Sequence, residues 1–231
     1  MSTVSATAEH PSNRLRSERA APNDAQQWFV VPAVCLILAG LSLPADLPVA
    51  RFCQAGYIPK FVIDLLKNAE TFGHSAGVAL IVLTVLFLDP RGKERAVTMA
   101  LAAIGGGMGA NLVKLCVGRC RPQSLDLLTA DLTDTFIGLF RLGAGGSGHQ
   151  SFPSAHTATA VGLATALAAA YPRGRIWFAV LAILVGLQRI QTSAHFPSDV
   201  FAGAAVGWIA AHVVLSLRQP KSTPSLSSES R

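Results

Sequence analysis

Six long apolar runs constrain this chain more than any other feature of its sequence. Each approaches the ~20 residues that an α-helix needs to cross ~30 Å of hydrocarbon. The runs are Trp28 to Ala45, Phe72 to Leu88, Ala96 to Val113, Ala155 to Tyr171, Ile176 to Ala194 and Val200 to Leu217. They leave no room for a separate soluble domain, so the sequence predicts an all-α fold, an integral membrane six-helix bundle.

The composition supports this class, because 51% of the residues are hydrophobic and only 14% are charged. Soluble domains carry about 25% charged residues. The first run is short and ends among Pro44, Asp46 and Pro48, and a secretory signal peptide is also apolar and near the start of its chain. A signal peptide has a short charged leader, however, whereas residues 1–27 are mostly polar, so we expect a retained span.

The two ends of the chain differ from the apolar region between them. Residues 1–27 are rich in Ser, Ala, Arg and Pro without apolar periodicity, which predicts a disordered tail. Residues 28–218 then form the six-span membrane domain, and residues 219–231 form a second polar tail.

The net charge of +6 is distributed in clusters that predict the orientation of the chain. The clusters are Arg14, Arg16 and Arg19, then Arg91, Lys93 and Arg95, then Arg173 and Arg175, then Arg218 and Lys221. With six spans all four lie on one side, so both termini are expected in the cytoplasm, most simply at a bacterial inner membrane. A nucleic-acid partner is not expected, because no basic face with interleaved aromatic residues is present. The sequence leaves the oligomeric state open.

The segment from Pro59 to Ala69 differs from the apolar runs, because its apolar residues recur at helical spacing among charged ones. This pattern predicts a short amphipathic helix on the outer side that begins at a proline. Two placements stay open: packed on the outer loops, or in the headgroup zone of the outer leaflet, where it would shape the entry of membrane lipids.

The glycines and the cysteines give two further predictions. Glycines at spacings typical of close helix contacts occur in the third and sixth runs, at Gly105, Gly106, Gly107, Gly109, Gly203 and Gly207. Four cysteines do not form a disulfide framework; Cys53 and Cys120 both fall on the outer side, and a bridge between them is left open.

Polar residues at four run ends meet at one depth if the termini are cytoplasmic. The third run ends at Lys114, the fourth begins beside His156, the fifth ends near Arg189, and the sixth begins at Asp199. Ionisable groups are costly in a membrane and are therefore functional candidates. This convergence predicts a functional site on the outer, periplasmic side.

The cations of this site predict an anion as the guest. Lys114 and Arg121 are seven residues apart, which would place them on one helix face, and Arg189 adds a second guanidinium. Arginine matches phosphate oxygens in pairs. Ser154 is a typical helix N-cap, so free N–H groups near Ala155 would point at the same anion. We expect a phosphate or a similar tetrahedral oxyanion.

Two histidines complete a possible phosphoryl-transfer site. His195 followed by Asp199 fits an imidazole oriented by a carboxylate, with its other nitrogen free to attack phosphorus. His156 would protonate the departing alkoxide, and the cations would stabilise the equatorial oxygens.

The same residues allow other interpretations. Lys114 and Arg189 alone would be interpreted as side chains snorkelling to the interface. His156, His195 and Asp199 together could ligate a metal, but the surrounding cations oppose a divalent ion, so neither a metal nor another cofactor is expected. A membrane anion transporter would also gather cations, but has no need of a carboxylate-oriented histidine.

Three motifs in register resemble those of the type 2 phosphatidic acid phosphatase superfamily. Lys114 to Pro122 fits Lys-x6-Arg-Pro, Pro153 to His156 resembles Pro-Ser-Gly-His, and Arg189 to Asp199 fits Arg-x5-His-x3-Asp. The resemblance implies a metal-independent phosphatase that works through a phosphohistidine. By position it implies that Lys114, Arg121, Ser154, Ala155 and Arg189 hold phosphate, that His156 is the acid, that His195 is the nucleophile and that Asp199 orients it.

The chain departs from the superfamily pattern at two positions, with Ala155 in place of glycine and Gln188 in place of serine. Neither departure removes a reacting group. The expected substrate is a phosphate monoester or pyrophosphate of a lipid or polyprenyl carrier. The alternative within the enzymes is a lipid phosphotransferase, in which an alcohol rather than water resolves the phosphohistidine.

Overall fold

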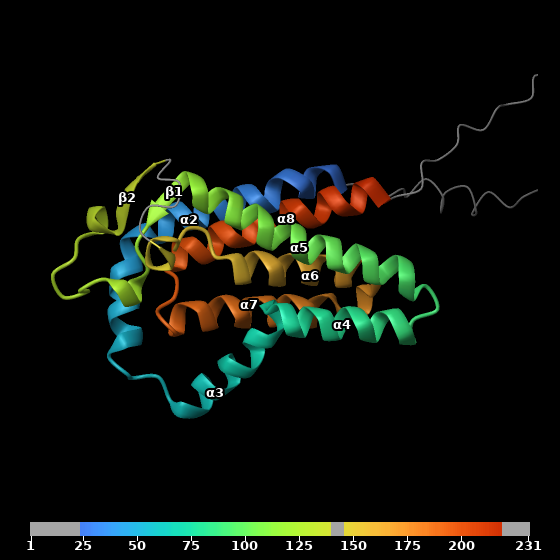
Figure 1. The fold of residues 1–231 in the computed structure, drawn as a ribbon, viewed down its shortest axis with the longest axis horizontal. Helices are drawn as coiled ribbons and strands as arrows, with labels where there is room; N and C mark the ends of the chain where they lie inside the picture. Colours follow the sequence, from blue (N-terminus) through green and yellow to red (C-terminus); the bar gives the residue numbers. More distant parts are fainter. Residues whose placement is uncertain (1–23, 140–145, 219–231) are drawn as a thin grey trace, which may run out of the picture.

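The computed structural model describes residues 24–139 and 146–218 and is mostly helical. The long helices lie side by side with nearly parallel axes (Figure 1). They are α2 (Asp24–Gln54), α4 (Ser75–Leu88), α5 (Gly92–Cys116), α6 (Ala155–Ala170), α7 (Arg175–Gln191) and α8 (Pro197–Arg218). Residues 1–23 of the predicted tail at 1–27 and the whole predicted tail at 219–231 lie outside the described residues. Residues 24–27 are helical and begin α2, so the first tail ends earlier than predicted.

Short elements connect these helices. They are α3 (Lys60–Ala69), η1 (Glu70–Gly73), β1 (Val117–Arg119), η2 (Pro122–Ser124), η3 (Leu132–Thr135), β2 (Phe136–Leu139), η4 (Ser147–His149) and η5 (Pro172–Gly174). β1 and β2 pair antiparallel, with Val117 opposite Leu139 and an irregularity after Gly118. The strands were not expected from the sequence, and they gather at one end of the bundle (Figure 1).

Four helices in the described part of the chain are long and apolar enough to cross a membrane: Trp28–Gln54, Gly92–Cys116, Pro172–Gln191 and Pro197–Arg218. The pair Lys60–Gly73 and Ser75–Leu88, bent by 62°, raises the number to five if it forms one span. α6 is apolar but has only 16 residues. A membrane-spanning helical protein is thus confirmed, and the count of six spans stays a prediction.

The first predicted span ends later than expected. α2 continues through Pro44 and Pro48 to Gln54 instead of stopping at Ala45. Proline inside a helix removes a hydrogen bond and bends the axis. Figure 1 shows α2 beginning beside α8 and then turning away along the end of the bundle. The helix therefore carries Asp46 into the region where the other helix ends meet.

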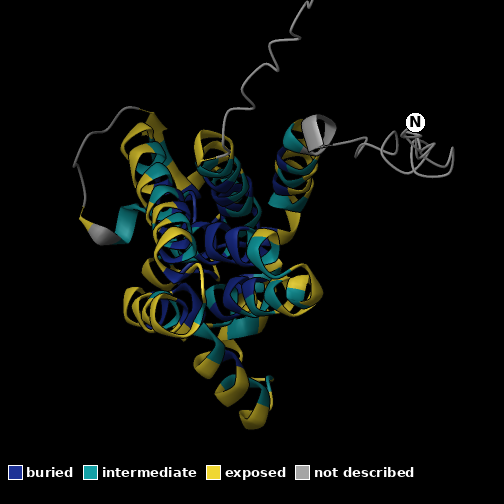
Figure 2. Cartoon of the chain, turned by 90° about the vertical axis from the view of Figure 1, so that its right-hand side faces the viewer, coloured by how far each residue is buried: buried dark blue, intermediate teal, exposed yellow. Residues whose placement is uncertain are grey.

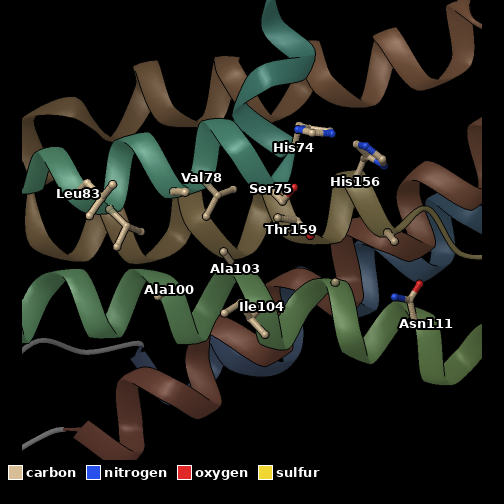
Figure 3. Close-up of a pocket in the computed structure, with 15 residues that line it drawn as sticks. His74, Ser75, Val78, Leu83, Ala100, Ala103, Ile104, Asn111, His156 and Thr159 are labelled. Carbon is tan, nitrogen blue, oxygen red and sulfur yellow. The ribbon is translucent and has the colours of Figure 1, made fainter.

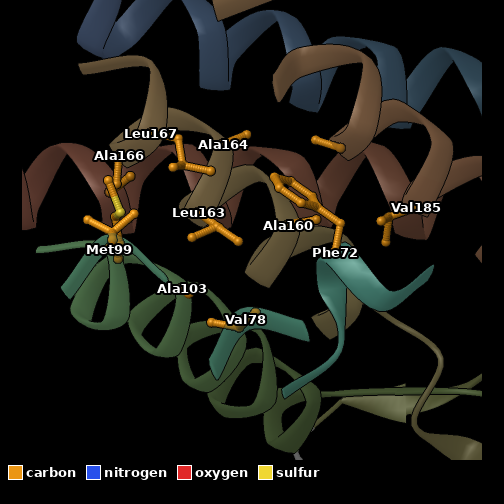
Figure 4. Close-up of a cluster of buried hydrophobic side chains, with 14 residues drawn as sticks. Phe72, Val78, Met99, Ala103, Ala160, Leu163, Ala164, Ala166, Leu167 and Val185 are labelled. Carbon is orange, nitrogen blue, oxygen red and sulfur yellow. The ribbon is translucent and has the colours of Figure 1, made fainter. Parts of the chain in front are cut away.

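The core is formed by small residues and a few large apolar ones. Met99, Leu163 and Val185 are fully buried in a cluster shared by α5, α6 and α7 (Figure 4). A Cβ atom at Gly106 or at Gly207 would collide with the Ala158 carbonyl oxygen of α6. The predicted close helix packing by glycine is confirmed, with α6 held between α5 and α8.

The outer surface of the bundle is apolar. Buried residues lie inside and exposed residues outside the helix bundle (Figure 2). Large exposed apolar side chains are spread over several helices, among them Leu80, Phe87, Leu112 and Ile183. A soluble protein rarely exposes so many large apolar side chains, and hydrocarbon is the solvent that suits them.

Candidate active site

Four helix ends meet where the sequence predicts them to meet. The C-terminal ends of α5 and α7 and the N-terminal ends of α6 and α8 lie at the end of the bundle that carries β1 (Figure 1). Lys114, Arg121, His156, Arg189 and His195 are near enough to one another to interact electrostatically. The structure therefore gathers the predicted site residues into one cluster.

His195 lies in the turn between α7 and α8 and is 3% exposed. Ser193 in this turn has a left-handed backbone with φ 54°. The His195 Nδ1 atom lies 2.7 Å from the Ser151 carbonyl oxygen and 3.7 Å from Asp199 Oδ2. A carbonyl oxygen only accepts hydrogen bonds, so Nδ1 carries the proton and Nε2 carries the free lone pair.

Burial lowers the pKa of His195 to about 4, although Asp199 opposes this shift. The imidazole is therefore neutral at pH 7, which is the form that a nucleophile needs. The direct hydrogen bond predicted between His195 and Asp199 is replaced by one to Ser151, and Asp199 acts on the ring from 3.7 Å.

Asp199 is completely buried and fully hydrogen-bonded. Its Oδ2 atom accepts hydrogen bonds from Ser151 Oγ at 2.6 Å and from the Phe196 backbone N–H at 2.8 Å. Its Oδ1 atom accepts from Arg119 Nη1 at 2.5 Å. A buried carboxylate needs such partners, because an unpaired one would cost several kcal/mol. These contacts hold the carboxylate at one position beside His195.

Arg119 was not predicted as a site residue. It is completely buried, pairs with both Asp199 and Asp46, and has its guanidinium over the rings of Phe136 and Phe196. The sequence carries a weak signal for it, a second arginine two residues before Arg121. Its partners are 73 and 80 residues away in the chain, so the pairing was not readable from spacing.

The predicted arrangement of Lys114 and Arg121 on one helix face is wrong. α5 ends at Cys116, because the next residues pair with β2, and Arg121 follows in the loop. Lys114 Nζ instead donates to the Gln150 carbonyl oxygen at 2.7 Å, which anchors the loop before α6. The two cations approach the site from different elements.

The guanidinium groups of Arg121 and Arg189 have unused donors. The Nε atom of each is buried and has no hydrogen-bond partner among the described residues. Burial also lowers the pKa of Arg121, since it disfavours the charged form. A bound anion would satisfy these donors and offset the cost of burying the charges.

Ser154 and Ala155 begin α6 as predicted. The buried Ser154 hydroxyl caps the helix, accepting from Thr157 N at 3.4 Å and from Thr157 Oγ1 at 2.9 Å. The Ser154 backbone N–H donates to the Asp199 carbonyl oxygen at 3.0 Å, which ties α6 to α8. The helix start therefore faces the same end of the bundle as His195.

The His156 side chain is about one-third exposed and lies near Glu70 and His74. Its Nε2 atom is 3.9 Å from Glu70 Oε1, and its ring centroid is 6.1 Å from that of His74. Glu70 also accepts from Arg189 Nη1 at 2.6 Å. The sequence reasoning missed Glu70, which lies 119 residues before Arg189 in an unremarkable polar turn.

His156 also lines a cavity of about 650 Å³ between α4, α5 and α6. His74, His156 and Asn111 lie at one end of this cavity, and Val78, Leu83, Ala100 and Ile104 line the rest (Figure 3). The cavity is therefore polar at the end that His156 lines and apolar along the rest.

Two other expectations concern cysteines and metals. Cys53 and Cys120 are free thiols, so the bridge left open by the sequence is not formed. In residues 24–139 and 146–218, no three His, Cys, Asp or Glu side chains are grouped as a metal site requires.

The site combines a neutral, oriented imidazole with cations whose donors lack partners among the described residues, and it lies in a helical membrane bundle. These features are typical of a membrane enzyme that acts on phosphate groups. The sequence profile of the PAP2 superfamily matches residues 95–222. The chain belongs to this superfamily, as the three motifs indicated, and it is a membrane phosphatase.

Bacterial relatives support this assignment. The lipid A 1-phosphatase of Rhizobium etli is 31% identical over 165 residues, which cover 64% of this chain and 68% of the relative. The lipid A 1-phosphatase of Rhizobium johnstonii is 39% identical over 180 residues, covering 78% of this chain but only 57% of the relative.

Two crystal structures share the fold. One is the PAP2-type phosphatidylglycerolphosphate phosphatase of Bacillus subtilis, with a TM-score of 0.56 and 17% identity over 85% of this chain and 99% of that one. The other is Aquifex aeolicus LpxE, with a TM-score of 0.55 and 21% identity over 74% and 95% of the two chains.

Proposed function

We propose that this protein removes phosphate from a membrane lipid through a phosphohistidine formed on His195. The observation that carries the proposal is the hydrogen bond from His195 Nδ1 to the Ser151 carbonyl oxygen, which leaves Nε2 free to attack. Lys114, Arg121, Arg189 and the start of α6 at Ser154 and Ala155 hold the phosphate, and Asp199 orients His195.

The reaction has two steps. His195 Nε2 bonds to phosphorus while the bond to the lipid oxygen breaks, and His156 gives that oxygen its proton. Water then attacks the phosphohistidine, releases inorganic phosphate and regenerates both histidines. An alcohol in place of water would make the same site a lipid phosphotransferase, and product analysis separates the two reactions.

A lipid substrate is favoured by the cavity beside His156. A phosphorylated headgroup at the polar end would place an apolar chain along Val78, Leu83 and Ile104. Two relatives are lipid A 1-phosphatases, so the 1-phosphate of a lipid A-like glycolipid is the first candidate substrate. A membrane anion transporter, the other class considered, gives no role to the immobilised imidazole.

The proposed orientation follows the charge clusters. With six spans, counting α6 and the bent α3–α4 pair as one each, the positive-inside rule favours cytoplasmic termini and a site on the periplasmic side of the inner membrane. α3 then lies at the outer surface, where lipids would enter.

Phosphate release from a panel of lipids in detergent tests this function. The panel contains lipid A, phosphatidic acid, phosphatidylglycerophosphate and polyprenyl pyrophosphate, each assayed with and without a chelator. We expect release from at least one lipid that the chelator leaves unchanged, and no detectable release by His195→Ala or His156→Ala. Full activity of His195→Ala would contradict the mechanism, and loss of activity on chelation would point to a metal.

A further inference from the structure

Glu70 lies between a proposed phosphate-binding residue and the proposed general acid. Its Oε1 atom is 2.6 Å from Arg189 Nη1 and 3.9 Å from His156 Nε2. Its Oε2 atom accepts from Gln188 Nε2 at 2.9 Å. We propose that Glu70, held by Gln188, is a positioning residue that favours the protonated form of His156 and orients this side chain for proton donation; this inference rests on the proposed function.

The cations around His156 disfavour its protonated form. The ionisable groups near its ring are His74 between η1 and α4, Arg121 of the loop after β1, Arg189 of α7, His195 of the turn before α8, and Glu70 of η1. Among these described neighbours Glu70 alone carries negative charge. A protonated imidazole among cations is unfavourable, and an opposite charge within ~4–6 Å offsets that cost.

The backbone holds Glu70 close to His156. η1 packs against both α6 and α7. A Cβ atom at Gly73 would lie 2.8 Å from the His156 carbonyl oxygen and 2.7 Å from Val185 Cγ1, so only glycine permits this approach. The backbone of η1 is thus held close to the first turn of α6, within reach of the Glu70 side chain.

Gln188 explains why this chain departs from the superfamily pattern beside Arg189. Its amide is buried, donates to Glu70 through Nε2 and accepts from Arg189 Nη1 through Oε1 at 3.3 Å. Serine at this position is too short to reach the Glu70 carboxylate. Arg189 retains a buried Nε without a described partner, so pairing with Glu70 leaves a donor for phosphate.

A general acid matters only when the leaving group is poor, and this gives a specific test. Two phosphate monoesters with the same long alkyl tail are compared, one releasing an aliphatic alcohol and the other a nitrophenol. Glu70→Gln is expected to lower kcat about 100-fold for the alcohol ester, since general acids contribute roughly 10²–10⁴-fold. The nitrophenol ester needs no proton, so its kcat changes by less than about threefold.

Further variants keep the test decisive. Glu70→Asp keeps the charge and should recover part of the activity on the alcohol ester. Asp64→Asn removes an exposed carboxylate from neighbouring α3 and should change neither rate. The alkaline limb of the kcat profile should move to lower pH in Glu70→Gln, because its His156 loses a proton more easily.

Equal losses on both esters, or an unchanged rate on the alcohol ester, would overturn the role of Glu70. His195→Ala is assayed beside it on the same two esters. Activity retained by His195→Ala means that the proposed function has failed. An inactive His195→Ala with equal losses in Glu70→Gln means that only this inference has failed.

Discussion

His195 is oriented mainly through a backbone carbonyl, with the carboxylate in support. The Ser151 carbonyl oxygen fixes the proton on Nδ1, while the Ser151 hydroxyl holds Asp199. One residue therefore sets both the tautomer of the nucleophile and the place of the charge that would stabilise the imidazolium. Arg119 completes the arrangement from the far side of Asp199.

The protonation state of His195 gives a prediction at this scale. Burial lowers its pKa to about 4 from an ordinary value near 6.5. A histidine is neutral above its pKa, so His195 in the free enzyme stays neutral with its proton on Nδ1 as the pH falls from 7 to about 5. Nitrogen NMR of histidine-labelled protein in detergent, assigned with His195→Asn, checks this. A His195 signal that titrates near pH 6.5 would contradict it.

Single residues divide into those that the sequence could reveal and those that it could not. His156, Arg189, His195 and Asp199 were found because charge and imidazole at run ends are unusual in a membrane chain. Arg119 and Glu70 were missed because their meaning comes from partners brought together by the fold. Gln188 was noted as a departure, and only its contact with Glu70 gives it a physical reason.

At the scale of elements, the helix ends were predictable and their exact bounds were not. Apolar runs that cross the membrane in alternating directions suffice to place four ends together. The observed helix bounds differ from the predicted ones in two places. α5 gives way to β1, because strand pairing competes with helix there, and α2 continues through Pro44 and Pro48. Neither a three-residue strand nor a bent helix leaves a clear pattern in a single sequence.

The glycine contacts of α6 give a prediction for these elements. Gly207→Ala places a methyl group against the Ala158 carbonyl oxygen, whereas a methyl at Gly105 meets only Ala210 Cβ at 3.6 Å. Overpacking costs about 1–3 kcal/mol, so Gly207→Ala should unfold more easily in detergent. Gly105→Ala is the matched control and should be as stable as the parent or slightly more so. Equal stability of the two variants would contradict the close packing of α6 between α5 and α8.

At the scale of the whole molecule, the bundle separates three environments. Large apolar side chains cover the outside, mostly small residues pack the inside, and the buried charged groups lie at the site end of the bundle. The sequence predicted this separation from composition and run length, and it predicted the superfamily from three motifs. The number of spans could not be fixed, because α6 is short and α3 and α4 meet at a bend.

The most direct test of the whole account is to trap the covalent intermediate. A radiolabelled lipid phosphate is mixed with the enzyme and quenched within the first turnovers. We predict a label that survives alkali, is lost in acid and maps to His195, and that is absent from His195→Asn. A label on another residue, or His195→Asn that still releases phosphate at the parent rate, would contradict the assignment of His195 as the nucleophile.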